Sequence, residues 1–151
     1  MAEEVKKPQV KNYVSTVGRR KEAVARVRLY AASKVLLFGK EYKKGDILVN
    51  GKPIQEFFNF TPYAPRYNKI LRDTDTSDKY VISAKVAGGG TSGQIDAVIL
   101  GIARALDKID STKHHKVLRE KDYLMRDPRT RERRKVGNAG KARRKKSSPK
   151  R

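Results

Sequence analysis

Residues 88–106 read GGGTSGQIDAVILGIARAL, and this stretch decides more of the fold than any other in the chain. Three glycines come first, and apolar residues then recur every three or four positions on the segment that follows: Ile95, Val98, Ile99, Ile102, Leu106 and Ile109. Such spacing places apolar side chains along one face of an α-helix. We therefore predict an amphipathic helix over residues 93–109, with Thr91 or Ser92 as its N-cap.

The glycines connect this helix to a predicted strand. Residues 80–86 alternate, with Tyr80, Ile82, Ala84 and Val86 on one face. A glycine-rich loop that leads into a helix N-terminus offers backbone amides to a phosphate, which makes Gly89 and Gly90 candidate contacts. A tight turn with close packing needs the same glycines and is the alternative interpretation. A nucleotide-hydrolysing loop is disfavoured, since no Gly-Lys-Ser/Thr and no complete dinucleotide fingerprint is present.

A hairpin is predicted near the N-terminus. Residues 11–18 and 22–31 both alternate, and Gly18-Arg19-Arg20-Lys21 forms the turn between them. In the second run one face is predicted to meet a core, and it consists of Ala23, Ala25, Val27 and Leu29. The opposite face is predicted to meet solvent or a partner, and it consists of Val24, Arg26, Arg28 and Tyr30. Three cations on a tip with two arginines behind them suit phosphate binding, with a solvated tip as the alternative.

The remaining elements have weaker signals. Residues 35–38 and 47–49 are short strand candidates, with the charged segment 39–45 as a hairpin loop between them. Asn50-Gly51 marks a turn, and a helix follows Pro53. Further helices are predicted around 66–71 and 115–120. Together the elements predict an α+β or α/β sandwich, in which one mixed sheet has helices packed on one face.

Positive charge is concentrated in the last 26 residues. The chain has 151 residues, with 37 Lys and Arg against 16 Asp and Glu, a net charge of +21. Residues 126–151, the basic tail, carry +11 of this and almost no apolar side chains. Such a segment cannot offset its ordering entropy alone, so we predict that it orders on a polyanionic partner. We predict a flexible leader at 1–10, a globular domain at 11–125 and the tail at 126–151.

Several function classes are excluded or disfavoured. The chain has no Cys, which excludes disulfides and thiolate chemistry. No apolar run approaches the roughly 20 residues that span a bilayer, and the first residues predict neither a secretory signal nor a transit peptide. His114 and His115 are adjacent and make poor joint metal ligands, and the acidic residues are scattered. We predict an intracellular protein that is not an enzyme and has no metal or cofactor.

Four segments together resemble the small-subunit ribosomal protein nine family, in its bacterial and organellar branch. They are GRRKEAVARVR at 18–28, NGKPI at 50–54, the glycine-rich stretch at 88–106, and the basic tail. Departures are Val136 where a Tyr is common, and Ser147-Ser148-Pro149 where an aromatic residue usually precedes the final residues. Residues 33–46 are longer than the usual connection and predict an extended hairpin on the rRNA-facing or solvent side.

The resemblance implies an α+β, two-layer sandwich with the fold of the second domain of ribosomal protein five. It implies a structural constituent of the small-subunit head, a monomer within a cytoplasmic or organellar ribosome. Its partners would be small-subunit rRNA, neighbouring ribosomal proteins and the anticodon stem-loop of the peptidyl-site tRNA, with no membrane. The tRNA contacts match Lys150 and Arg151 here. The predicted rRNA-binding residues are Arg19, Arg20, Lys21, Arg26, Arg28, Gly89, Gly90, Arg129, Arg131, Arg133, Arg134, Lys135, Lys141, Arg143 and Arg144.

Two competing functions remain at the level of sequence. A free RNA- or DNA-binding chaperone or architectural protein would share this composition. A small phosphotransfer enzyme would share the glycine-rich loop, but the chain has no Walker lysine and no placed catalytic acid. Sedimentation with the small subunit distinguishes the first, and a nucleotide-binding assay the second.

Overall fold

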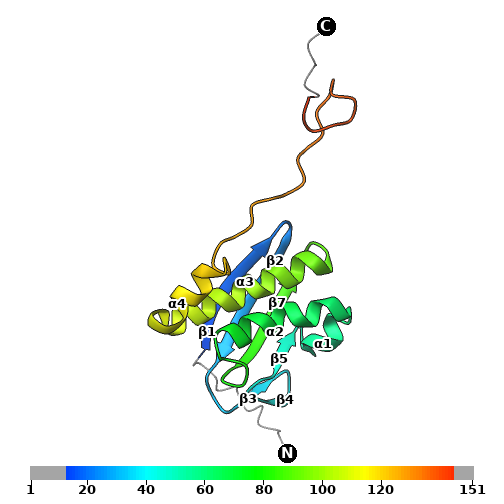
Figure 1. The fold of residues 1–151 in the computed structure, drawn as a ribbon. Coiled ribbons are helices and arrows are strands. Elements are labelled where there is room, and N and C mark those ends of the chain that lie inside the picture. The colour runs from blue at the N-terminus through cyan, green and yellow to red at the C-terminus, as the bar shows by residue number, and fades with distance from the viewer. Residues whose placement is uncertain (1–12, 145–151) are drawn as a thin grey trace, which may run out of the picture.

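The computed structural model describes residues 13–144 and contains one main sheet, a small two-stranded sheet and a set of helices (Figure 1). The strands are β1 Tyr13–Arg20, β2 Ala23–Tyr30, β3 Lys34–Leu37, β4 Lys40–Lys43, β5 Ile47–Val49, β6 Lys52–Pro53 and β7 Val81–Ala87. The helices are α1 Ile54–Phe57, α2 Ala64–Asp73, α3 Thr91–Ile109 and α4 Ser111–Glu120, with a 3-10 turn at Thr61–Tyr63.

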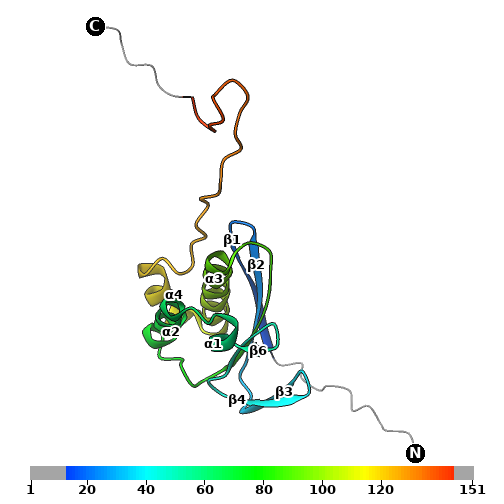
Figure 2. The same ribbon diagram turned by 90° about the vertical axis from the view of Figure 1, so that its right-hand side faces the viewer.

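The main sheet has the strand order β1-β2-β7-β5-β6. Strands β1, β2 and β7 pair antiparallel, whereas β5 runs parallel to β7. The helices gather on one face of this sheet (Figure 2). The opposite face, which we call the uncovered face, meets only the β3–β4 hairpin at one end within residues 13–144. The prediction of a mixed sheet with helices on one face is confirmed. The division into leader, globular domain and tail stays a prediction.

The core lies between the sheet and α3. Val27, Ile95 and Ile102 are fully buried there, and each such side chain contributes about 1.5–3 kcal/mol relative to an exposed one. The backbones of β1 and α3 approach closely where Gly18 meets Gly101. A Cβ on Gly18 would lie 1.9 Å from the Ala97 carbonyl oxygen, so only glycine fits at this crossing.

The β1–β2 hairpin forms as predicted, but its turn is shorter. Arg20 pairs with Ala23, and Lys21 and Glu22 alone make the turn, with Lys21 at a φ of 51°. Gly18 lies in β1 rather than in the turn. Because it has no side chain, β1 can pack closely against α3 at this position. A two-residue connection of this kind matches the twist of the two strands it joins.

Two predictions for the segment 33–46 are wrong. The predicted loop 39–45 contains strand β4, which pairs with β3 across Phe38 and Gly39, both at positive φ. Strand β5 joins the main sheet instead of pairing with β3. The physical reason is that a two-residue turn at 38–39 closes the hairpin, which leaves Ile47–Val49 free to cover the core edge of β7.

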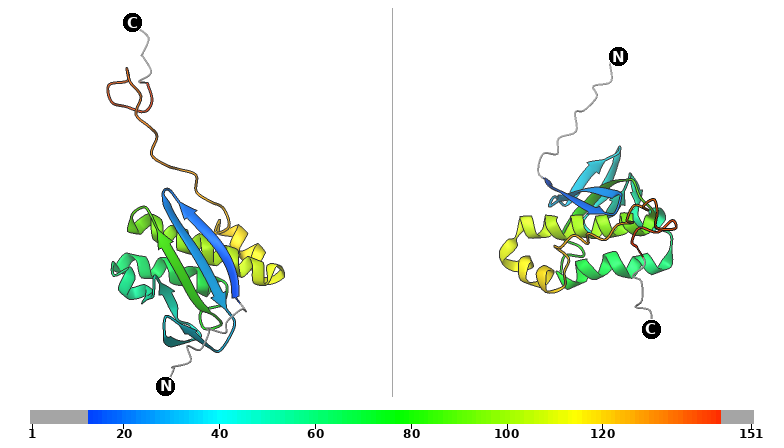
Figure 3. Two further views of the ribbon diagram at one scale, coloured as in Figure 1. Left: turned by 180° about the vertical axis from the view of Figure 1, so that it is seen from behind. Right: turned by 90° about the horizontal axis from the view of Figure 1, so that it is seen from above.

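Tyr30 also differs from its predicted exposure to solvent or a partner. It is buried against Val35 and Val81, with Leu37 and Tyr42 beside them. The β3–β4 hairpin therefore packs onto the uncovered face of the main sheet through a second small apolar cluster. Figure 3 (left) shows the molecule from behind, with this face toward the viewer and the hairpin at its lower end.

Helices α2 and α4 are longer than predicted, and α3 begins earlier. Gly90, in an extended conformation, is the N-cap in place of Thr91 or Ser92, and no side chain caps the helix. Gln94 explains this start, since its backbone N–H donates to the Gly90 carbonyl and its side chain donates to the Gly88 carbonyl. Helix α2 extends the predicted segment 66–71 at both ends, and α4 extends 115–120 at its start only.

The described part of the basic tail, residues 126–144, contains no helix or strand. It leaves α4, passes the β1–β2 turn and runs away from the body (Figure 1). Residues 135–141 form a compact turn, in which Lys135 donates its N–H to Lys141 and Lys141 donates to Asn138. Among residues 13–144, no helix has the length and apolar character needed to cross a membrane.

Candidate nucleic-acid interface

Two motifs that lie far apart in the sequence meet at one end of the molecule. Arg19, near the end of β1, and Lys21, in the β1–β2 turn, are both exposed. The start of α3 lies against this turn, since a Cβ on Gly93 would be 3.5 Å from the Arg20 carbonyl oxygen. Cationic side chains and the unpaired amides of a helix N-terminus thus occupy the same surface, an arrangement that favours a phosphate.

Gly88 and Gly89 are required by packing. Both have positive φ values, and a Cβ on Gly88 would lie 2.5 Å from the Glu22 carbonyl oxygen. A Cβ on Gly89 would lie 3.0 Å from the Ala23 nitrogen. The loop therefore holds the β1–β2 turn closely, as the tight-turn interpretation requires. Gly90 has open space around it, so its exposed backbone remains accessible to a phosphate.

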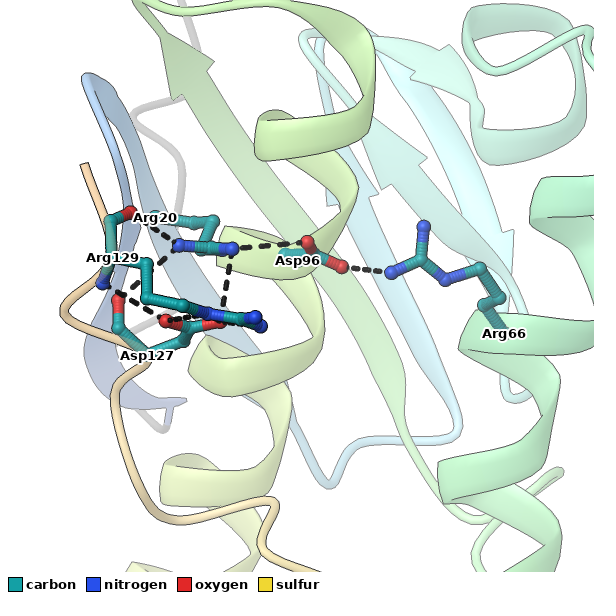
Figure 4. Close-up of polar contacts among 5 residues, drawn as sticks. All are labelled: Arg20, Arg66, Asp96, Asp127 and Arg129. Carbon is teal, nitrogen blue, oxygen red and sulfur yellow. Dashed lines mark hydrogen bonds and ion pairs between the residues drawn. The ribbon is translucent and has the colours of Figure 1, made fainter. Parts of the chain in front are cut away.

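Arg20 points into the molecule, unlike its two neighbours. Its guanidinium lies 2.9 Å from an Asp127 carboxylate oxygen and 3.7 Å from one of Asp96. It also donates to the Arg129 carbonyl oxygen at 2.7 Å. Figure 4 shows these contacts, which join β1, α3 and the first residues of the basic tail. Arg20 is thus engaged as an anchor for the tail, and its rRNA contact stays a prediction.

Further ionic contacts surround this anchor. Arg66 of α2 pairs with Asp96 from the other side (Figure 4). The Arg129 guanidinium bonds the Asp127 carboxylate through two nitrogens, at 3.0 and 2.7 Å. Donation from the Arg129 side chain and backbone, with the charge of Arg20, holds the pKa of the Asp127 carboxyl well below its usual range. Asp127 is therefore charged across the neutral and mildly acidic range.

Arg26 and Arg28 lie on the uncovered face of the sheet, as predicted. Arg26 is paired in register with Lys85 of β7, and Arg28 with Ser83. The guanidinium of Arg28 stacks over the Tyr13 ring, 5.0 Å from its centroid. This surface is separate from the β1–β2 turn and is a second place where cations gather.

The remaining predicted residues lie along the tail. Arg143 bonds the Glu132 carboxylate, with its Nε 2.9 Å from one oxygen, and this closes the turn at 135–141. Those that are exposed and form no ion pair within residues 13–144 are Arg131, Arg133, Arg134, Lys135, Lys141 and Arg144. Lys150 and Arg151 lie outside the described residues. Within the described chain, no cluster of three or more His, Asp or Glu side chains could hold a metal ion.

Comparison with known proteins identifies the family. The model of the family described as ribosomal protein S9/S16 matches residues 18–151. The chain belongs to the ribosomal protein S9/S16 family. The matched span includes the β1–β2 turn, the glycine loop, Arg26 and Arg28 on the uncovered sheet face, and the whole basic tail. This family consists of ribosomal proteins rather than enzymes, which confirms the prediction that the chain is not an enzyme.

Relatives of this S9/S16 chain include organellar and bacterial proteins. It is 39% identical over 127 residues to the small ribosomal subunit protein uS9c of Mesostigma viride, with 83% of each chain covered. It is 40% identical over 121 residues to uS9 of Prochlorococcus marinus, with 80% of each covered. Against uS9 of an Arthrobacter species it is 37% identical over 123 residues, covering 82% of this chain and 67% of the relative.

Sequence reasoning missed three polar residues and one aromatic residue on the surfaces of this S9/S16 chain. Lys85 could have been found, because the alternation that buries Ile82 and Ala84 places residue 85 on the opposite face. Asp96 and Arg66 carry no such signal, since only the tertiary contact of α2 with α3 pairs them. Phe38 was interpreted as the end of a strand, whereas it lies exposed in a turn.

Proposed function

We propose that this chain is a structural constituent of the small ribosomal subunit and that it binds small-subunit rRNA. One observation carries the proposal: the β1–β2 turn, the start of α3 and the origin of the basic tail come together at one end of the body. Family membership supports it, because the relatives are named as small ribosomal subunit proteins.

The physical basis is charge neutralisation. Folded rRNA is a dense polyanion, and each phosphate that a Lys or Arg neutralises releases condensed counterions. A tail with a net charge of +11 can lie between rRNA helices that would otherwise repel one another. Recognition then depends on the shape and backbone of the RNA more than on its base edges.

The finer parts of the proposal follow the family resemblance. The body adopts the fold of the second domain of ribosomal protein five, and the chain is a monomer in the subunit head beside other ribosomal proteins. It works in a cytoplasmic or organellar ribosome, and a chloroplast-type relative supports the second of these. Lys150 and Arg151 contact the backbone of the peptidyl-site tRNA.

The test of the ribosomal role is sedimentation. Extract of cells that express the chain is washed at high salt and separated on a sucrose gradient, and the chain is quantified by mass spectrometry. We expect near-stoichiometric recovery with the small subunit. Recovery at the top of the gradient would overturn the proposal in favour of a salt-labile, general nucleic-acid binder.

The tRNA contact needs a separate test. Deletion of Lys150 and Arg151 is expected to lower peptidyl-site tRNA affinity by at least about fivefold, since two interactions of about 0.5–1.5 kcal/mol each are removed. Subunit assembly should be unaffected, as measured by the same gradient. Equal tRNA affinity of wild-type and truncated subunits would reject the contact.

A further inference from the structure

A groove lies between the β3–β4 hairpin and the uncovered face of the main sheet. The hairpin is held there by the apolar cluster of Tyr30, Val35 and Val81. The groove has a volume of about 620 Å³, and its lining includes Arg26, Arg28, Phe38, Asn50, Ser83 and Lys85. Strands of the main sheet supply most of its lining, and the turn of the hairpin supplies its aromatic side through Phe38.

Phe38 is displayed in this groove by its backbone. It occupies the turn between β3 and β4 at a φ of 50°, a conformation that is uncommon for a bulky residue. Its side chain is 68% exposed, and the ring lies over Gly51, where a Cβ would be 3.8 Å from the Phe38 Cγ. Because this apolar ring is exposed, it lacks the burial that stabilises an aromatic side chain in a core. A ligand that stacks on the ring would supply that burial.

The floor of the groove is cationic and rigid. Arg26 and Lys85 are register partners on β2 and β7, and Arg28 is stacked over Tyr13. Among the described residues that line the groove, none is Asp or Glu. Asn50 fixes the groove wall, since its side chain exchanges two hydrogen bonds with the backbone of Val86, at 2.8 and 3.1 Å.

We propose that this groove binds a segment of single-stranded RNA, with phosphates on Arg26 and Lys85 and a base stacked on Phe38. Cations beside an exposed aromatic ring form the usual combination for unpaired nucleic acid, since every base has a face that can stack. An acidic protein segment would satisfy the charges but would leave Phe38 without a matching group. The inference rests on the proposed rRNA-binding role and adds a second contact surface, away from the tail.

The test is a titration of the full chain with hexauridylate, monitored residue by residue through the amide chemical shifts. Resonances of Ser83 and Lys85 report the groove, while those of residues 129–144 report the tail, so the two sites are measured separately. We expect groove amides to shift in the wild type. Phe38→Ala should raise the dissociation constant measured there about fivefold or more, because base stacking is removed.

Matched variants separate the groove from general charge and hydrophobicity. Leu36→Ala removes another exposed apolar side chain of the same hairpin, and Lys116→Gln removes a cation from α4, on the helical side. Both should leave binding at the groove unchanged, whereas Lys85→Gln should weaken it. Because Lys85 and Phe38 are exposed, these variants are expected to fold, and the amide spectrum itself shows whether they do.

Three outcomes would overturn the inference. One is hexauridylate shifting tail amides alone. Another is Phe38→Ala behaving as Leu36→Ala does. The third is a hexaglutamate peptide shifting the groove amides at lower concentration than hexauridylate, which would assign the groove to a protein partner. If the groove does not bind RNA but the chain sediments with the small subunit, the ribosomal role is retained. If the chain does not sediment with the small subunit, that role is rejected whatever the groove binds.

Discussion

Gly18 is the residue at which β1 crosses α3 without room for a methyl group. Its Cβ would lie 1.9 Å from the Ala97 carbonyl oxygen and 2.6 Å from the Gly101 nitrogen, both backbone atoms that cannot turn aside. We expect Gly18→Ala to lower the free energy of unfolding by about 2–3 kcal/mol or more, as overpacking does. Urea unfolding followed by circular dichroism measures the change.

Gly93→Ala is the control for this substitution. A Cβ on Gly93 meets its neighbours at 3.5 Å and beyond, and the residue lies inside α3. Alanine should therefore raise the free energy of unfolding by about 0.5–1 kcal/mol through helix propensity and reduced unfolded-state entropy. Similar decreases for both variants would mean that the crossing is less tight than the geometry indicates.

Asp110 is the N-cap of α4, and its side chain accepts a hydrogen bond from the Lys113 N–H. Hydrogen bonds from Lys113 and Thr112 lower the pKa of its carboxyl to about 2, where a free Asp titrates near 3.9. A lowered pKa means that its support for the start of α4 is complete above about pH 4 and disappears as pH falls through about 2. A carbon-13 titration of the Asp110 carboxyl should show that midpoint, and an ordinary midpoint would contradict the cap.

The junction between body and tail is decided at the scale of elements. Arg20 contacts Asp127 and the Arg129 carbonyl, so Arg20→Met should release the first residues of the tail from β1. Hydrogen exchange of the Arg129 amide, which donates to the Asp127 carboxylate, should become several-fold faster, since this segment is then no longer held against the body. Arg19→Met removes an equal charge from an exposed neighbour and should leave the exchange unchanged. Equal exchange rates in both variants would show that Arg20 does not hold the tail against the body.

Local patterns predicted most elements but not all of their partners. The 3.6-residue repeat identified α3, and the period of two identified β1, β2 and β7, because each of these buries one face. Strand β4 was missed since Lys40, Glu41 and Lys43 have low strand propensity, and only pairing with β3 makes them extended. The N-cap of α3 lies at Gly90 because Gln94 bonds back to the glycine loop, which itself packs against the β1–β2 turn.

At the scale of the whole molecule, the tail should dominate the salt dependence of rRNA binding. Removing residues 126–151 is expected to flatten the slope of log affinity against log salt by roughly 0.7–0.9 for each phosphate that the tail neutralises. Filter binding of full-length and shortened chains to small-subunit rRNA at several salt concentrations measures both slopes. Parallel slopes would place the phosphate contacts on the body instead.

The class of the fold, the family and the uneven distribution of charge could be predicted from the sequence alone. These follow from periodicity, motif and composition, which are local properties of the chain. Only the tertiary structure decided which cations are available. Arg19 and Arg20 are neighbours, yet Arg19 is exposed while Arg20 is enclosed by Asp96 and Asp127. The physical reason is that these carboxylates come from α3 and the tail, so only the packing of distant segments brings them to one guanidinium and not to the next.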